Sequence, residues 1–131
     1  MASQRDLADE LLALAVDGAV AAEALLDVGV VTDRIVGFHA QQAVEKALKA
    51  VLAARGVEFP FTHSVGALAE LSTNAGAPLP PELSEVDRHT PFGVGLRYGA
   101  LDDLAPVARA TAIAWAGQTI AWARTILDAV E

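Results

Sequence analysis

The segment FHAQQAVEKALKAVL, residues 38–52, has the clearest helical pattern in the chain. At 100° per residue its apolar positions form one continuous face: Ala40, Ala43, Val44, Ala47, Leu48, Val51 and Leu52. Polar and charged positions fall together on the other side: His39, Gln42, Glu45, Lys46 and Lys49. The pattern predicts an amphipathic helix that buries one side and exposes the other.

The residues around this segment set the limits of the predicted helix. Thr32 is a good N-cap, and Asp33 in the first turn is favoured by the helix dipole. The helix is expected to run to about Arg55, because Gly56 is a typical C-terminal stop.

The rest of the chain also reads as helices joined by short loops. We expect a first helix over residues 5–26, a short third helix begun by Thr62 or Ser64 and ending near Leu71, a turn of helix near residues 82–86, and a last helix from Asp102 or Asp103 to about Val130. No internal repeat or long linker divides the chain. The prediction is one all-α domain over residues 1–131, an up-and-down bundle of four to five helices.

Composition supports this fold and excludes several chemistries. The chain has 28 alanines in 131 residues and no cysteine, which favours helices and excludes disulfides, cysteine zinc sites and thiol catalysis. Neither a metal-ligand motif nor a phosphate loop is present, so no metal and no cofactor is predicted. The acidic N-terminus does not resemble a signal peptide, and no apolar run is long enough to span a membrane. We expect a soluble cytoplasmic protein.

Charge is distributed unevenly along the chain. The net charge is −8, and residues 1–33 hold seven acidic residues and one basic residue. Residues 34–64 reverse this balance, with four basic residues and two acidic ones. Non-specific coating of nucleic acid is therefore disfavoured, and residues 34–64 are the segment that could form a local site for phosphate.

The polar face of the second predicted helix has two interpretations. A solvated surface explains it, with Glu45 and Lys49 as an i,i+4 ion pair. A binding site explains it as well, because His39 and Lys46 lie two turns apart on one stripe with Gln42 between them. Imidazole, amide and ammonium groups are the donors that bind a phosphate or a nucleotide edge.

The last predicted helix has an apolar arc wider than one neighbour can cover. Two apolar lines run along it with small residues between them: Ile113, Ile120 and Leu127 on one, Trp115, Trp122 and Ile126 on the other. A central helix of a single bundle would explain the arc. We favour a homodimer that buries the Trp115/Trp122 face.

Three motifs make the chain similar to a known family. The run HAQQAVEKALKA at 39–50, THSVGAL at 62–68 and Arg97-Tyr98 together resemble the HEPN (higher eukaryotes and prokaryotes nucleotide-binding) family. The resemblance implies an all-α bundle, usually dimeric. Many members are metal-independent ribonucleases with an Arg-x(4–6)-His motif, and many are toxins paired with a minimal nucleotidyltransferase.

The ribonuclease motif has one literal match, at Arg34 and His39. In ribonuclease members it is expected near the last long helix, where this chain has Arg97-Tyr98 and no following histidine. A five-residue offset also places two side chains about 140° apart on a regular helix. For His63, beside a capping threonine, we expect local hydrogen bonding rather than catalysis.

Three functions remain open from the sequence. The first is a toxin–antitoxin or nucleotide-handling module that binds a nucleotide, RNA or a partner nucleotidyltransferase through His39, Gln42, Lys46, Lys49, Arg97 and Tyr98. The second is an endoribonuclease toxin with Arg34 and His39 as its catalytic pair. The third is a non-catalytic dimeric scaffold.

Overall fold

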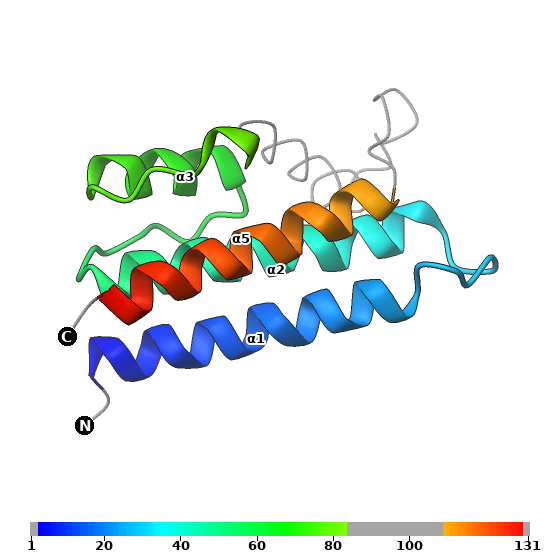
Figure 1. Ribbon diagram of the computed structural model, residues 1–131, viewed down its shortest axis with the longest axis horizontal. Helices are drawn as coiled ribbons and strands as arrows, with labels where there is room; N and C mark the ends of the chain where they lie inside the picture. Colours follow the sequence, from blue (N-terminus) through cyan, green and yellow to red (C-terminus); the bar gives the residue numbers. More distant parts are fainter. Residues whose placement is uncertain (1–2, 84–108, 130–131) are drawn as a thin grey trace.

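The computed structural model describes residues 3–83 and 109–129. These residues form four α-helices and one short 3₁₀ helix, with no strand in either range. The long helices are α1 (Gln4–Ala24), α2 (Asp33–Ala54) and α5 (Arg109–Ala129); α3 (Val65–Asn74) and η1 (Pro81–Leu83) are shorter. Figure 1 shows α1 antiparallel to α2 and α5, with α3 beyond α2. The predicted all-α fold class is confirmed.

Local sequence signals explain where the long helices begin and end. Ser3 caps α1 in a capping box with Asp6, and the Thr32 hydroxyl caps α2 by accepting from the backbone N–H of Ile35. After the C-cap of α2, Gly56 has a φ of +70°, a conformation that favours glycine. The predicted limits of α2 are therefore confirmed to within one residue.

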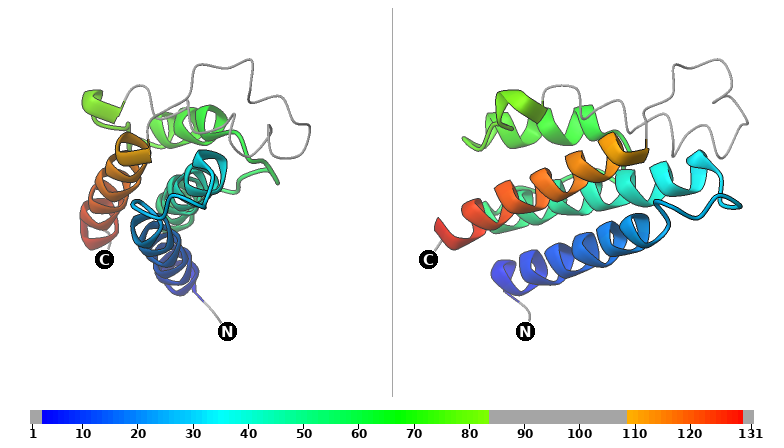
Figure 2. Two further views of the ribbon diagram at one scale, coloured as in Figure 1. Left: turned by 90° about the vertical axis from the view of Figure 1, so that its right-hand side faces the viewer. Right: turned by 45° about the vertical axis from the view of Figure 1, so that its right-hand side comes forward.

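Helix α2 lies at the centre of the bundle and supplies most of the core. The end-on view in Figure 2 shows α1, α3 and α5 arranged around it. The predicted apolar face of α2 is buried along its whole length. Small residues let α1 approach closely, since a Cβ on Gly18 would lie 3.4 Å from the His39 carbonyl oxygen and 3.5 Å from Ala43 Cβ.

Helix α5 packs on α2 and α1 through part of the apolar arc that was predicted from its sequence. Ala112, Ala116 and Ala123 are buried against the bundle together with Ile120 and Leu127. Trp115 and Trp122 are only partly buried at the edge of the core. The predicted start of this helix at Asp102 or Asp103 lies outside the described residues. None of the helices described has the length and apolar character needed to cross a membrane.

The chain between α2 and α5 covers one side of α2. Of the two predicted caps of α3, Ser64 is the N-cap, because its hydroxyl accepts from the Ala67 N–H. Thr62 instead accepts from the backbone N–H of Ser64. Helix α3 continues to Asn74, three residues beyond the predicted end at Leu71. The loop between α2 and α3 carries His63 over the middle of α2, where the polar face was expected to meet water.

Candidate functional site

Glu45 is completely buried, although the sequence placed it on a solvated face. The interpretation of that side of α2 as a uniformly solvated surface is therefore wrong at this position. Gln41, one turn earlier, is buried as well. The cause is the loop that leads to α3, which crosses this side of α2 and brings His63 onto the carboxylate. A buried charge of this kind needs compensating partners nearby.

Four side chains supply the partners of the Glu45 carboxylate. The Lys49 ammonium donates to Oε1 at 2.9 Å, and His63 Nδ1 lies 3.1 Å from the same oxygen. Oε2 accepts from the amide nitrogen of Gln41 at 2.9 Å and from that of Gln42 at 3.3 Å. The expected Glu45–Lys49 pair is thus present, but as part of a buried network.

The surroundings keep the Glu45 carboxyl ionised. Burial raises its pKa, but hydrogen bonding and charge attraction from Lys49 lower it, as do hydrogen bonds from Gln41 and His63. Together these interactions hold the pKa of Glu45 below its ordinary value of 4.5. The ionised carboxylate can only accept hydrogen bonds, so its partners must all act as donors.

His63 is fixed by two separate interactions. Its Nδ1 must carry the proton, because it faces a carboxylate that has none to give. Its backbone carbonyl oxygen accepts from the Gln41 amide nitrogen at 3.2 Å. The hydrogen bonding expected of His63 is present, although its partner is a residue of α2 and not a neighbour in the loop. The side chain stays 46% exposed.

The two lysines of the stripe differ in their surroundings. The Lys49 side chain is only 12% exposed, bound to Glu45, and its ammonium lies 5.8 Å from the centroid of the Phe59 ring. Lys46 is half-buried and has no acidic partner within the described ranges. Lys46 is therefore the ammonium of this stripe that can take a new anionic ligand.

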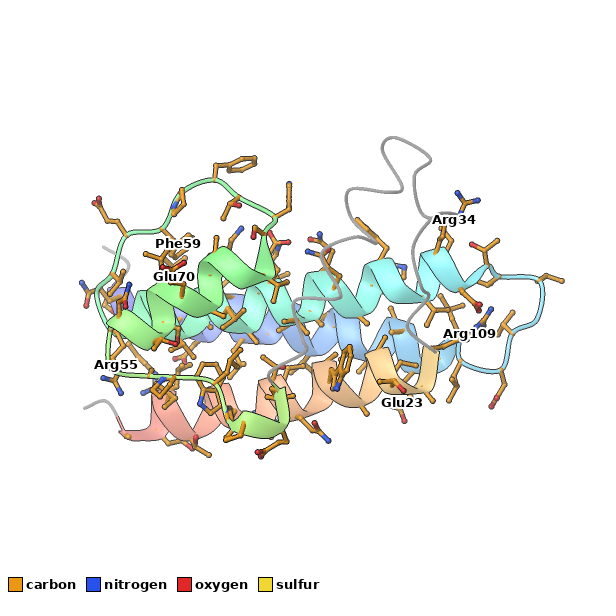
Figure 3. All side chains as sticks on the ribbon, turned by 90° about the horizontal axis from the view of Figure 1, so that it is seen from above. Glu23, Arg34, Arg55, Phe59, Glu70 and Arg109 are labelled. Carbon is orange, nitrogen blue, oxygen red and sulfur yellow. The ribbon has the colours of Figure 1, made fainter. Side chains whose placement is uncertain are left out.

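The proposed Arg34–His39 pair lies on one continuous helix. Arg34 is exposed in the first turns of α2 (Figure 3), and His39 is half-buried with its ring edge-on to Phe38 at 6.1 Å between centroids. The structure shows no contact between Arg34 and His39 in the chain that it describes. The regular helix keeps their directions about 140° apart. Arg97 and Tyr98 lie outside the described residues.

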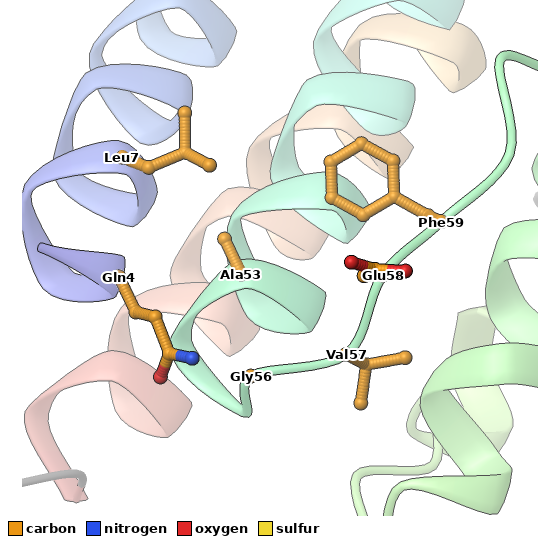
Figure 4. Close-up of a pocket in the computed structure, with 7 residues that line it drawn as sticks. All are labelled: Gln4, Leu7, Ala53, Gly56, Val57, Glu58 and Phe59. Carbon is orange, nitrogen blue, oxygen red and sulfur yellow. The ribbon is translucent and has the colours of Figure 1, made fainter.

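A surface pocket of about 390 Å³ lies where the end of α2 meets the start of α1. Figure 4 shows its seven lining residues, which are Gln4, Leu7, Ala53, Gly56, Val57, Glu58 and Phe59. The lining is mainly apolar, with one carboxylate at Glu58. Over residues 3–83 and 109–129, no three histidine, aspartate or glutamate side chains gather as a metal site would require.

Arg109, which sequence reasoning did not single out, organises the opposite end of the bundle. Its guanidinium donates to the carbonyl oxygens of the α1–α2 turn at Leu25, Leu26, Val28 and Val31. Its Nε also lies 2.6 Å from Asp33 Oδ1 in the first turn of α2. One arginine therefore joins the start of α5 to the turn between α1 and α2.

The long helices are antiparallel, and Gln41 and Glu45 of α2 are bound to His63 in the loop that follows α2. This is an all-α bundle of the kind that the resemblance implied. The family model for the HEPN domain matches residues 8–131. This match covers nearly the whole chain, and the protein belongs to the HEPN domain family. Comparison with curated proteins and with solved structures gives no match.

Proposed function

We propose that this HEPN domain binds the phosphate groups of a nucleotide or RNA on the stripe of α2 that contains His39, Gln42, Lys46 and Lys49. Membership of the HEPN family supports a nucleotide-handling or ribonuclease-like role in general terms. Within residues 34–64, basic side chains outnumber acidic ones, whereas the chain as a whole is acidic. This segment is therefore where an anionic ligand meets the least repulsion.

The proposal rests on one observation: of the two lysines, Lys49 has an acidic partner and Lys46 has none in the part of the chain that the structure describes. Glu45 neutralises Lys49, so Lys49 contributes mainly to the local structure. Lys46, one residue after Glu45, has no acidic partner in the part of the chain that the structure describes. His39 lies two turns before Lys46 on the same side of the helix. A phosphate between them would receive charge-assisted hydrogen bonds.

Gln42 has a different part in this site. Its amide nitrogen is used by Gln41 Oε1 at 2.9 Å and by Glu45 Oε2 at 3.3 Å. The side-chain oxygen is then the atom left for a ligand donor, such as an amino group of a base. The stripe thus offers positive charge to phosphate and one fixed acceptor beside it.

Titration with fluorescently labelled single-stranded RNA and with ATP, followed by anisotropy or calorimetry, tests the proposal. Replacing Lys46 with alanine should weaken binding about five- to tenfold and reduce the salt dependence by about one ion. The matched control is Arg124→Ala, which removes one exposed cation from α5 and should leave affinity unchanged. If both variants lose the same affinity, or if Lys46→Ala loses none, the binding site is not on this stripe.

A further inference from the structure

The pocket between the end of α2 and the start of α1 is separate from the stripe proposed to hold phosphate. Leu7 of α1 and Phe59 of the α2–α3 loop lie on opposite sides of the pocket, with Ala53 of α2 between them (Figure 4). Its volume of about 390 Å³ is in the range of pockets that bind small organic molecules. None of its seven lining residues belongs to the stripe.

The two apolar walls of the pocket differ in how firmly they are held. Phe59 is partly buried against the core, and the Lys49 ammonium lies 5.8 Å from the centroid of its ring. Because Glu45 neutralises this ammonium at 2.9 Å, Lys49 adds little repulsion toward a second cation near the ring. Leu7, on the other wall, is 44% exposed. A ligand with an apolar body would cover both walls and release the water on them.

The polar groups of the lining determine the charge of the ligand. Glu58 is the one ionisable residue of the lining, and it is exposed and forms no ion pair with the residues that the structure describes. The Gln4 amide lies against Gly56, where a Cβ would be 3.0 Å from Gln4 Nε2. The amide oxygen can accept from a ligand donor. The net charge of −8 on the whole chain also attracts cations more than anions.

We infer that this pocket binds a small organic cation with an apolar body, such as an aromatic ring, and a protonated amine. The ring packs between Leu7 and Phe59, and the amine binds the Glu58 carboxylate. An alkylamine is protonated at neutral pH, as the lysine side chain is. Because the carboxylate repels phosphate, this site is additional to the proposed function and does not depend on it.

Tryptamine is a suitable probe because it joins an indole ring to a protonated amine, and indole-3-acetate carries the same ring with a negative charge. Each compound is added to the full chain while backbone amide chemical shifts are followed. Tryptamine should bind with a Kd of roughly 1 mM or below and move the amides of residues 4–7 and 53–59 most. Indole-3-acetate should bind about threefold more weakly or worse, because Glu58 repels it.

Two pairs of variants test the two parts of the ligand separately. Glu58→Gln should weaken tryptamine binding about two- to fivefold, as expected for an exposed ion pair. Its matched control is Glu23→Gln, which removes an exposed carboxylate at the other end of α1 (Figure 3) and should change nothing. Leu7→Ala should weaken both compounds about twofold or more through lost apolar contact. Leu14→Ala, two turns further along α1 and 46% exposed, should weaken neither.

Three results would overturn the inference: tryptamine moves no amide around the pocket, indole-3-acetate binds equally well, or Glu58→Gln and Glu23→Gln bind tryptamine with the same affinity. Tryptamine binding that falls as the protein concentration rises would overturn it too, because a second copy of the chain would then occupy the pocket. Lys46→Ala should leave tryptamine binding unchanged. If tryptamine binds and RNA does not, the proposed function fails and this inference stands. Unfolding curves check that every variant is folded.

Discussion

Glu45 and Lys49 form an ion pair at 2.9 Å, with the carboxylate fully buried and the lysine side chain 12% exposed. An i,i+4 pair on a helix surface contributes a few tenths of a kcal/mol, about 0.5 at most. The pair in α2 is of another kind, because the loop carrying His63 covers it and three further donors complete it. Removing Glu45 leaves Lys49 without its ion-pair partner and leaves Gln41, Gln42 and His63 each with one hydrogen-bond acceptor fewer.

Replacing Glu45 with alanine should therefore strongly destabilise the fold. Loss of one partner from a buried ion pair costs about 3–5 kcal/mol, and we expect the lower part of that range because Lys49 can turn toward water. Chemical unfolding at neutral pH measures the change. Glu70→Ala, which removes an exposed carboxylate from α3, is the matched control and should change stability by less than about 0.5 kcal/mol. A small loss for Glu45→Ala would show that the network does not hold the loop.

Stability should also depend on pH through Glu45. Its folded-state pKa lies below the ordinary value of 4.5, so its contribution is complete above that value and is lost as pH falls through the folded pKa. The wild type should lose stability as pH falls below about 4.5, and Glu45→Gln should lose less over the same fall in pH. Thermal unfolding across this range gives the comparison. Parallel pH curves for the two proteins would mean that Glu45 titrates normally.

Arg109 should be essential for the end of the bundle where α1 turns into α2. Its guanidinium serves several backbone carbonyl oxygens and Asp33 at once, which a lysine cannot reproduce. We expect Arg109→Lys to cost about 2 kcal/mol and to increase hydrogen exchange in residues 25–32. Arg124→Ala, on the same helix, should affect neither. An unchanged exchange rate in the turn would contradict the role assigned to Arg109.

The homodimer stays a prediction, and α5 offers a direct way to test it. Trp115 and Trp122 are partly buried, and Gln118 is exposed between them on that side of the helix. We expect a dimer by light scattering at roughly tens of micromolar, with Gln118→Arg shifting the protein toward monomer because it buries an unpaired charge at the contact. A monomeric wild type, or a Gln118→Arg variant that dimerises with unchanged affinity, would show that this face is not the dimer contact.

The sequence predicts the fold well because its signals are local. Thr32 and Gly56 mark the ends of α2 through capping and a positive φ, both of which act within one turn of the helix. The apolar stripes of α2 and α5 likewise reflect burial on a regular helix, which needs no knowledge of the neighbour.

The candidate site is harder to predict because its contacts are distant in sequence. Glu45 meets His63 across 18 residues, and Arg109 meets Val31 across 78. A helical wheel shows Glu45 among polar residues, and only the path of the loop reveals that it is buried. The sequence does contain one indication that Glu45 is buried. Two glutamines and two lysines lie within four residues of this single carboxylate, which is more hydrogen-bond donors than an exposed acid requires.

In the proposed function, the ligand lies beside the His63 loop on the half-buried stripe of α2 that contains His39, Gln42, Lys46 and Lys49. The most direct test is to follow backbone amide chemical shifts while single-stranded RNA is added, with ATP in a second titration. If the ligand lies there, the largest shifts should fall in residues 39–49 and 61–64, and Lys46→Ala should reduce them. Shifts confined to α1, α5 or the pocket around Gln4 and Phe59, or no shifts with either ligand, would contradict it.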